Sequence, residues 1–449
     1  MRALLARFLQ LMRALLSCLL QGEVFLLFEQ TPFGVVFCGG GPAAIGPIIA
    51  AARTGRLDDL LNRGIALIEP GPIGPGGFAH HRIAANSLGG PFLECLDDLD
   101  GTPFAALREL PETRALRALA DVHPPLSVVA SFLARLGAVV SDLLQAHPRC
   151  RSVSSTVVGL RLAADTVHVA TADGGRLHAD RVVIASGGRP LSDFAGAEIV
   201  PGLSLAPHRA KVWHSEAFID ARRRAPAARG KVVIVGGSHS AWSVADLILS
   251  DVDELTVVHR SGIRLFYRGV EQARSDGYLF DPVRDVCPAS GRVNRYGGLR
   301  GRAFELARAA LGLAGPGPRP VRLVHVDGPE SRPAAERAFA DADLIVMANG
   351  FEAALPPISY ADGTPLIAAV GPTGTVVTAT GHLVDVRGNV HPNLLAYGLG
   401  AGLAPSAEVG GEPSYTRRAD GVWLYQYDIG RIVLDDLLHT ATTSGEIHA

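Results

Sequence analysis

The sequence predicts an α/β fold with two Rossmann-like dinucleotide-binding domains, and two observations support this prediction. An apolar run, a glycine-rich turn, a helical segment and a second apolar run with a polar end follow one another at residues 35–69. The same order returns at residues 231–260. Such apolar runs are typical of parallel strands buried on both faces, and the glycines allow a tight turn into the next helix. A chain of 449 residues is also too long for a single core.

Composition and charge exclude several classes of protein. The chain is 48% hydrophobic and 19% charged, which is typical of a globular protein, and its net charge of −2 creates no field that would attract nucleic acid. Its cysteines, at positions 18, 38, 95, 150 and 287, form no CxxC pair and no metal-ligand cluster. We therefore expect no metal site and no redox-active disulfide, in a reduced, cytoplasmic protein. The only lysines are Lys211 and Lys231, so a Schiff-base lysine is not expected.

Residues 1–30 form a segment of their own, in which leucine-rich stretches alternate with arginines up to residue 22. We expect an amphipathic helix packed on the first domain, or residues translated from an upstream start codon. Arg13 interrupts the apolar run, which disfavours a spanning helix. A helix lying on a membrane surface is the alternative. A signal peptide is disfavoured because a cofactor-binding domain follows directly.

The first fingerprint is complete. Gly39 permits the tight turn, Gly41 leaves room for a pyrophosphate against the backbone, and Ala44 takes the close-packing position that accepts Gly or Ala. Glu69 ends the second strand and can accept hydrogen bonds from a ribose hydroxyl. We predict cofactor contacts from Gly39, Gly40, Gly41, Pro42, Ala43, Ala44 and Glu69. A glycine-rich loop without a ligand is the alternative, which the strand before it and the acid after it disfavour.

The residues after the first fingerprint are expected to cover the cofactor and line the substrate pocket. Residues 70–78 are rich in proline and glycine, which predicts a loop, and we expect Gly77 and Phe78 to contact the cofactor. The neighbouring His80 and His81 have no third ligand at suitable spacing and are interpreted as loop histidines. Residues 103–148 are predicted to be mostly helical, and residues 153–169 and 179–184 to form strands. Pocket residues are expected within 78–130 and 265–320, where no spacing rule identifies them.

The second fingerprint carries a basic pair where the first has an acid. The strand 231–235 is followed by a GxSxxA turn, and the strand 255–258 ends on His259 and Arg260. A guanidinium matches the oxygens of a 2′-phosphate, so NADPH is favoured over NADH, with a solvated arginine as the alternative. The predicted contacts are Gly236, Gly237, Ser238, His239, Ser240 and Arg260. A strand at 343–351 is expected to close this domain. A last strand ending in Gly398 and Gly400 would return to the first domain and meet the cofactor, before a closing helix at 421–438.

These features resemble the two-dinucleotide-binding-domain flavoproteins, and within them the N-hydroxylating and flavin-containing monooxygenases. Residues 76–78 resemble the GG-plus-aromatic segment of those enzymes, and residues 212–218 resemble their HS motif, which includes His214. Residues 236–241 resemble their second nucleotide turn, and residues 348–351 resemble the ATGY segment, with Asn and Phe substituted. The chain departs from the FxGxxx pattern before the histidine and lacks the Baeyer–Villiger pattern HxxxWP.

The resemblance implies an FAD-binding domain made of residues 31–205 and 351–449, with an inserted NAD(P)H-binding domain at 206–350. It implies an FAD- and NADPH-dependent monooxygenase that oxygenates a small nucleophile, with an amine favoured, through a peroxyflavin. The expected partners are a small-molecule substrate and oxygen, with no nucleic acid. His214 is interpreted either as a residue that binds cofactor or steers the linker, or as a purely structural histidine, and no catalytic residue is identified. The alternatives are a reductase for a quinone or protein acceptor and a non-catalytic flavin-binding protein.

Overall fold

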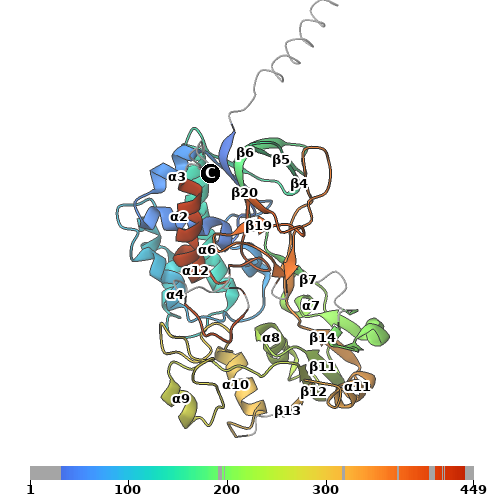
Figure 1. The fold of residues 1–449 in the computed structure, drawn as a ribbon. Coiled ribbons are helices and arrows are strands. Elements are labelled where there is room, and N and C mark those ends of the chain that lie inside the picture. The colour runs from blue at the N-terminus through green and yellow to red at the C-terminus, as the bar shows by residue number, and fades with distance from the viewer. Residues whose placement is uncertain are drawn as a thin grey trace, which may run out of the picture.

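The computed structural model describes residues 32–190, 195–196, 198–315, 319–371, 374–403, 410–416, 418 and 420–439. The predicted N-terminal helix lies outside these residues. Within the described part of the chain two large sheets form, one in each lobe of the molecule (Figure 1). The first takes its strands from residues 33–184 and 358–396, and the second from residues 212–347. The predicted α/β fold, with the second dinucleotide domain inserted into the first, is confirmed.

The first sheet is parallel at its centre and antiparallel on one side. Its order is β16-β4-β5-β6-β1-β2-β3, and β20 pairs with β6 and β19. The strands are β1 (Phe33–Cys38), β2 (Ile65–Ile68), β3 (Arg151–Val153), β4 (Val157–Leu162), β5 (Val167–Thr171), β6 (Arg176–Ile184), β16 (Ile358–Ser359), β19 (His382–Val384) and β20 (Val390–Ala396). The return of β20 to this sheet, parallel to β6, was predicted from the apolar run before Gly398.

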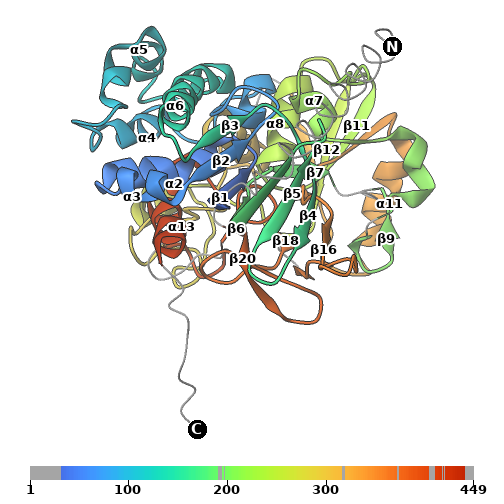
Figure 2. The ribbon, with the colours of Figure 1, turned by 90° about the horizontal axis from the view of Figure 1, so that it is seen from above.

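Alternate residues of β1 point to opposite faces of the sheet, and each face has its own core. Val35 and Phe37 pack against the helical layer, whereas Val36 and Cys38 face the antiparallel strands. The helices of that layer lie together on one side in Figure 2. They are α2 (Pro42–Arg53), α3 (Leu57–Arg63), α6 (Leu126–Ala146) and α13 (Asp428–Leu438), with α4 (Gly90–Leu93), α5 (Pro111–Arg117) and the 3₁₀ helices η1 (Gly76–His80), η2 (Glu94–Leu96) and η3 (Ala105–Glu109) beside them. The prediction of a mostly helical stretch at 103–148 matches η3, α5 and α6.

Among the described helices, α6 alone has the length and composition to span a membrane. One face of it, including Phe132, Leu136 and Val140, is instead buried in the first core. At Gly137 it meets the loop after β2 so closely that a Cβ would overlap the carbonyl of Ile73. We therefore interpret α6 as a core helix of the first domain.

The second sheet is parallel throughout and has the order β10-β14-β11-β12-β13. Its strands are β10 (Val212–His214), β11 (Lys231–Val235), β12 (Glu254–His259), β13 (Val321–His325) and β14 (Leu344–Met347). One face packs on α8 (His239–Ile248) and α10 (Gly301–Ala310), with α7 (Glu216–Ile219) and α9 (Val270–Ser275) nearby, and the other on α11 (Arg332–Asp341). Helix α8 begins three residues earlier than its apolar residues indicate, which places His239 and Ser240 in its first turn.

The connections between the lobes run through short strands. Strand β7 (Gly188–Pro190) pairs antiparallel with β15 (Phe351–Ala353), where the chain leaves and re-enters the first domain. The hairpin β8 (Glu198–Val200) and β9 (Leu203–Ser204), followed by η4 (Ala206–Lys211), packs its apolar residues on the second sheet. A further hairpin joins β17 (Val370–Gly371) and β18 (Gly374–Thr375). The domain boundaries at residues 205 and 350 remain a prediction. Ala195, Ile199, Leu203 and Leu205 pack in the core on the second sheet.

The closing helix predicted at 421–438 is two helices, α12 (Val422–Gln426) and α13, with a break at Tyr427. Both pack on α2, where Gly46 and Gly430 have no room for a Cβ because the carbonyl of Tyr425 lies against them. The apolar pattern runs through the break, so hydrophobicity alone predicted one helix. The bend lets both halves follow α2.

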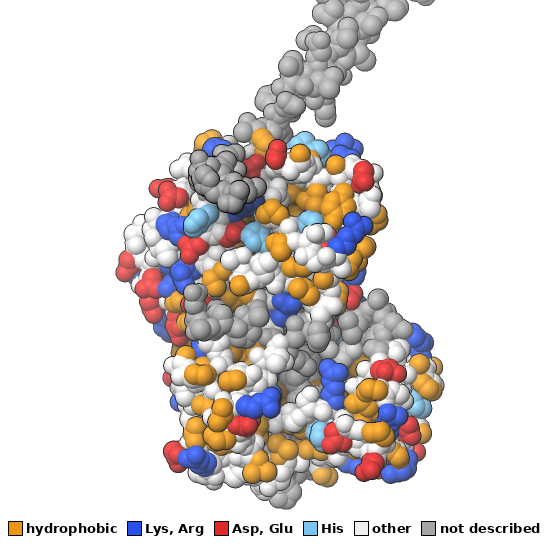
Figure 3. Space-filling view, in the orientation of Figure 1, with side chains coloured by type: hydrophobic (Ala, Val, Ile, Leu, Met, Phe, Trp, Pro, Cys, Tyr) orange, Lys and Arg blue, Asp and Glu red, His pale blue; other side chains and the backbone are white. Residues whose placement is uncertain are grey.

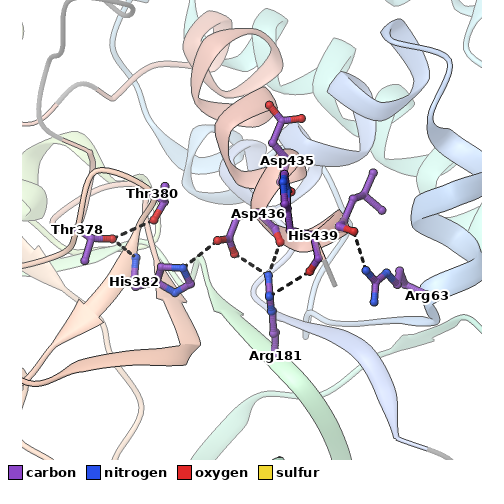
Figure 4. Close-up of polar contacts among 9 residues, drawn as sticks. Arg63, Arg181, Thr378, Thr380, His382, Asp435, Asp436 and His439 are labelled. Carbon is purple, nitrogen blue, oxygen red and sulfur yellow. Dashed lines mark hydrogen bonds and ion pairs between the residues drawn. The ribbon is translucent and has the colours of Figure 1, made fainter. Parts of the chain in front are cut away.

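A polar network fastens α13 to the first sheet (Figure 4). The carboxylate of Asp436 accepts a hydrogen bond from Arg181 on β6 at 2.8 Å and one from Nε2 of His382 on β19 at 2.9 Å. Arg63 also donates to the carbonyl of Leu438 at 2.7 Å. The side chains of Asp436 and Arg181 are 17% and 20% exposed, so loss of the carboxylate would leave a largely buried cation without its partner.

We predict that Asp436→Asn lowers the free energy of unfolding by about 1–3 kcal/mol, because it removes the charge that pairs with Arg181. The neighbouring Asp435 is a matched control, since its ion pairs with Arg56 and Arg431 are more exposed. Asp435→Asn should cost less than about 1 kcal/mol. Thermal and denaturant unfolding of the two variants measures both values. Equal losses would show that the Asp436 network does not hold α13 in the way described.

Candidate functional site

A cleft of about 2680 Å³ lies between the two lobes. Its walls come from the turn after β1, the loop after β2, the start of α8, the loop before α10 and the segment that leads into α12. Both sequence ranges expected to hold pocket residues, 78–130 and 265–320, contribute to the lining. Parallel strands of both sheets therefore point their carboxyl ends toward one space, where α/β proteins usually bind ligands.

The turn after β1 has the shape that the first fingerprint requires. Gly39 has a φ of +105°, and a Cβ there would lie 2.5 Å from the carbonyl oxygen of Ala185. The amide of Gly40 donates to Oε2 of Glu69 at 2.7 Å, which holds the carboxylate beside the turn. At Gly41 the space is open, since the nearest atom to a Cβ would be Cα of Gly76 at 3.6 Å. Ala44 is fully buried in the core, as its close-packing position demands.

This arrangement fits the pyrophosphate and ribose of a dinucleotide. Helix α2 begins at Pro42 with no side chain capping its amides, so its positive end is left for an anion. Gly39, Gly41, Pro42, Ala43 and Glu69 line the cleft, while Gly40 and Ala44 lie behind them. Glu69 already accepts hydrogen bonds from two backbone amides and retains acceptor capacity for a hydroxyl.

The loop after β2 and the end of β20 complete the same wall. The amide of Gly74 donates to the carbonyl of Gly40 at 2.7 Å, and Gly77 and Phe78 follow in η1 and line the cleft. On the other side, the buried hydroxyl of Tyr397 donates to the carbonyl of Ala43 at 2.7 Å. Gly398 lines the cleft directly after it.

Gly400 lies elsewhere. A Cβ at this position would overlap the backbone of Ala353 in β15, and Gly400 is not part of the cleft lining. A glycine is therefore required at position 400, because two backbone segments approach closely there. The contact with a cofactor that we expected from Gly400 remains a prediction.

The turn after β11 repeats the geometry of the first. Gly236 has a φ of +136°, and a Cβ there would lie 2.5 Å from the carbonyl oxygen of Ala348. Ser238 is the N-cap of α8 in an extended conformation, and its side chain leaves the helix amides free. His239 and Ser240 line the cleft, whereas Gly236, Gly237 and Ser238 do not. The start of α8 thus offers a second anion-binding end that faces the same space.

Two histidines near the second fingerprint have a pKa that burial lowers. Burial lowers the pKa of His239 to about 4, and its Nε2 donates to the carbonyl of Gly298 at 3.2 Å. Burial also lowers the pKa of His214, which accepts a hydrogen bond from the amide of Glu216 at 3.2 Å and donates to the carbonyl of Gly350 at 3.3 Å. His214 lies outside the cleft lining, and these contacts support its interpretation as a residue that holds the linker.

Arg260 is exposed at the carboxyl end of β12 and does not line the cleft. Beside it the rings of His259 and His325 stack with centroids 5.0 Å apart, and Nε2 of His325 donates to the carbonyl of Arg260 at 3.3 Å. The arginine therefore lies at the strand end where the ribose of a dinucleotide is bound, with its guanidinium open to solvent.

Sequence reasoning did not single out the arginines of the loop before α10. Arg292, Arg295 and Arg300 all line the cleft, together with Tyr296. The only signal was the arginine-rich composition of this irregular stretch, which does not tell which side chains face inward. Among the described residues no group of three or more His, Cys, Asp or Glu side chains is placed to bind a metal ion.

No protein-family model matches the chain. The chain is 42% identical over 435 residues to CMP-5'-(3-aminopropyl)phosphonate hydroxylase of Streptomyces rubellomurinus (strain ATCC 31215), an alignment that covers 91% of this chain and 98% of that protein. Among solved structures, it resembles the ornithine N-hydroxylase of Kutzneria sp. 744 with a TM-score of 0.51 at 17% identity, over 90% of this chain and 99% of the other. The likeness to the solved structure shows the shared fold. The 42% identity shows that the chain belongs to the family of CMP-5'-(3-aminopropyl)phosphonate hydroxylase and is an oxidoreductase of the monooxygenase class, as its motifs predicted.

Proposed function

We propose that the protein is an FAD- and NADPH-dependent monooxygenase that hydroxylates the nitrogen of a primary amine in a small substrate carrying phosphonate or phosphate. The observation that carries this proposal is the 42% identity over nearly the full length of both chains to a hydroxylase whose named substrate joins an aminopropyl group, a phosphonate and CMP. The overall reaction is RNH₂ + O₂ + NADPH + H⁺ → RNHOH + NADP⁺ + H₂O. It needs no nucleophilic side chain, which agrees with the absence of a recognisable one in the sequence.

The residues of the first fingerprint fit FAD. Glu69 would hold the ribose, and the free amides at the start of α2 would hold the pyrophosphate, beside the open side of Gly41. When bound, FAD supplies the redox chemistry, taking a hydride from NADPH and activating oxygen. Gly77, Phe78 and Gly398 lie on the same wall and would cover the cofactor.

The second fingerprint fits NADPH. The amides at the start of α8 face the cleft and would hold the pyrophosphate, while Arg260 would pair with the 2′-phosphate at the end of β12. The chain's own task is then to bring two cofactors and the amine together and to exclude water. Walls from both lobes serve that task, because the cleft is lined by residues of both.

We further propose that the protein is cytoplasmic and acts on a small molecule without nucleic acid. The free cysteines of the described residues, Cys38, Cys95, Cys150 and Cys287, support a reducing compartment. The membrane-surface role considered for residues 1–22 remains an alternative, since these lie outside the described residues.

The direct test of the function is turnover of an amine. With purified FAD-loaded protein, CMP-5'-(3-aminopropyl)phosphonate should be converted to a hydroxylamine, detected by mass spectrometry as a gain of one oxygen, with one NADPH consumed per product. The same phosphonate without the amino group should give no product. NADPH oxidation that depends on an added quinone and leaves the amine unchanged would instead support an electron-transfer reductase.

The FAD assignment can be tested without turnover. Gly41→Ala should leave the fold intact, because the added methyl has open space, but should lower the flavin bound per protein at least fivefold, since that space is needed by the pyrophosphate. Gly262→Ala is the matched control, because no atom lies within 4 Å of its added Cβ and Gly262 follows β12 of the second sheet, outside the cleft lining. The flavin absorbance of the two purified variants decides the matter, and full flavin content in Gly41→Ala would contradict the assignment.

The NADPH assignment predicts a change in coenzyme preference. Arg260→Gln should raise the KM for NADPH about tenfold and leave the KM for NADH nearly unchanged. The substitution removes the cation that pairs with the 2′-phosphate, and NADH lacks that phosphate. Arg322→Gln provides the control, since Arg322 is exposed in the middle of the neighbouring β13, paired in register with Thr256. Flavin reduction at varied coenzyme concentration measures both constants. An equal effect on NADPH and NADH would show that Arg260 does not contact the 2′-phosphate.

A further inference from the structure

Three arginines of one loop face the cleft without carboxylate partners. Arg292, Arg295 and Arg300 form no ion pair with any carboxylate of the described residues. Arg300 donates a hydrogen bond to the carbonyl of Arg295, and its guanidinium lies 4.0 Å from the ring centre of Phe266. Arg295 donates to the Sγ of Cys287 at 3.6 Å, and its guanidinium lies 5.1 Å from the ring centre of Tyr296.

The guanidinium of Arg300 is in an unfavourable electrostatic environment. Burial is the main cause that lowers its pKa to about 10; the charges of Arg292 and Arg295 act in the same direction, and the charge of Glu412 opposes them. The pKa of Arg295 is instead raised, because burial, which lowers it, is outweighed by the contact with Cys287 and by the charges of Tyr296, Cys287 and Asp428. A cation removed from water normally lies beside a carboxylate, as the half-buried Arg308 does beside Asp276 in the same domain. A guanidinium cluster that lacks such a partner is a good receptor for the oxygens of a phosphate or phosphonate.

The loop backbone is fixed in a conformation that keeps the arginines together. Asn294 has a φ of +48°, and its side-chain amide donates to the carbonyl of Leu265 at 3.0 Å. The buried carboxylate of Glu412 accepts hydrogen bonds from the amides of Tyr296 and Gly297, at 3.1 and 3.0 Å. The nearby acid is thus used to hold the backbone, and it does not form an ion pair with the arginines.

The loop lies where the two lobes meet. Its Gly298 carbonyl accepts the hydrogen bond from His239 at the start of α8, while Tyr296 packs on the core of the first domain and stacks on Tyr415 at 5.6 Å. The loop therefore contacts both lobes, and its arginines line the cleft without belonging to either fingerprint. On the face shown in Figure 3, basic and acidic side chains are interspersed over both lobes.

We propose that Arg292, Arg295 and Arg300 form the subsite that binds the phosphonate or phosphate oxygens of the substrate. This inference rests on the proposed function and adds to it the residues that recognise the anionic half of the amine. The rings of Tyr296 and Tyr415 line the same wall and offer an apolar face to a nucleobase. Anchoring the charged half here would leave the amine end free to reach the flavin.

The test uses CMP as the probe, with FAD-loaded protein saturated with NADP⁺ so that the nicotinamide site is already filled. Isothermal titration should show CMP binding to the wild type and at least tenfold weaker binding to Arg300→Gln. Arg292→Gln should also weaken CMP binding, and it carries little risk to folding because the side chain of Arg292 is exposed. Arg302→Gln is the matched control, because Arg302 lies two residues further on α10 and pairs with Asp246 at 3.0 Å outside the cleft.

The proposal is overturned if CMP does not bind to the NADP⁺-saturated protein, or if Arg302→Gln weakens CMP binding as much as Arg300→Gln does. It is also overturned if Arg300→Gln and Arg292→Gln weaken the binding of NADP⁺ and leave the binding of CMP unchanged, which would assign the arginines to the coenzyme. Amine turnover by the wild type separates this result from the proposed function. Turnover that is insensitive to both substitutions refutes the subsite alone, while arginine-dependent CMP binding without turnover refutes the function and keeps the subsite.

Discussion

The first dinucleotide site depends on a series of backbone contacts that leave no room for side chains. Gly39 turns against the carbonyl of Ala185, and Gly40 accepts a hydrogen bond from Gly74. Gly74 lies against the carbonyl of Leu133 in α6. Gly137 of the same helix lies against the carbonyl of Ile73. Strand, turn, loop and helix are therefore locked at the closest approach that a polypeptide allows. This positions the amides of α2, and with them the place where a pyrophosphate fits.

The same principle recurs at the second turn, where Gly236 lies against Ala348. The cleft lies between these two turns. It is lined by segments far apart in the sequence, among them the loop before α10, Tyr415 and the start of α8. The loop contributes three arginines to the lining, while the nearby carboxylate of Glu412 is bonded to backbone amides.

Helix α13 shows how the C-terminal segment contributes without touching the chemistry. The Asp436 network joins it to β6 and β19, and its glycine at position 430 lets it follow α2 closely. The start of α2 is in turn held by Tyr397 at the end of β20. The start of α2, where the first fingerprint predicts a pyrophosphate, is thus supported from β20 and, through the packing of α13 on α2, from the last helix of the described residues.

The sequence by itself determined the two fingerprints and the insertion of one domain into the other. Gly39, Gly236 and Glu69 could be assigned from it because turn geometry and buried parallel strands depend on local residue type and spacing. Only the tertiary structure decided which side chains share the cleft. It showed that Gly400 packs on backbone, that His214 bonds to the carbonyl of Gly350, and that one apolar pattern makes two helices. It also brought Arg292, Arg295 and Arg300 together at the cleft wall, because burial and the choice of ion partner depend on contacts between distant segments, which spacing along the chain does not encode.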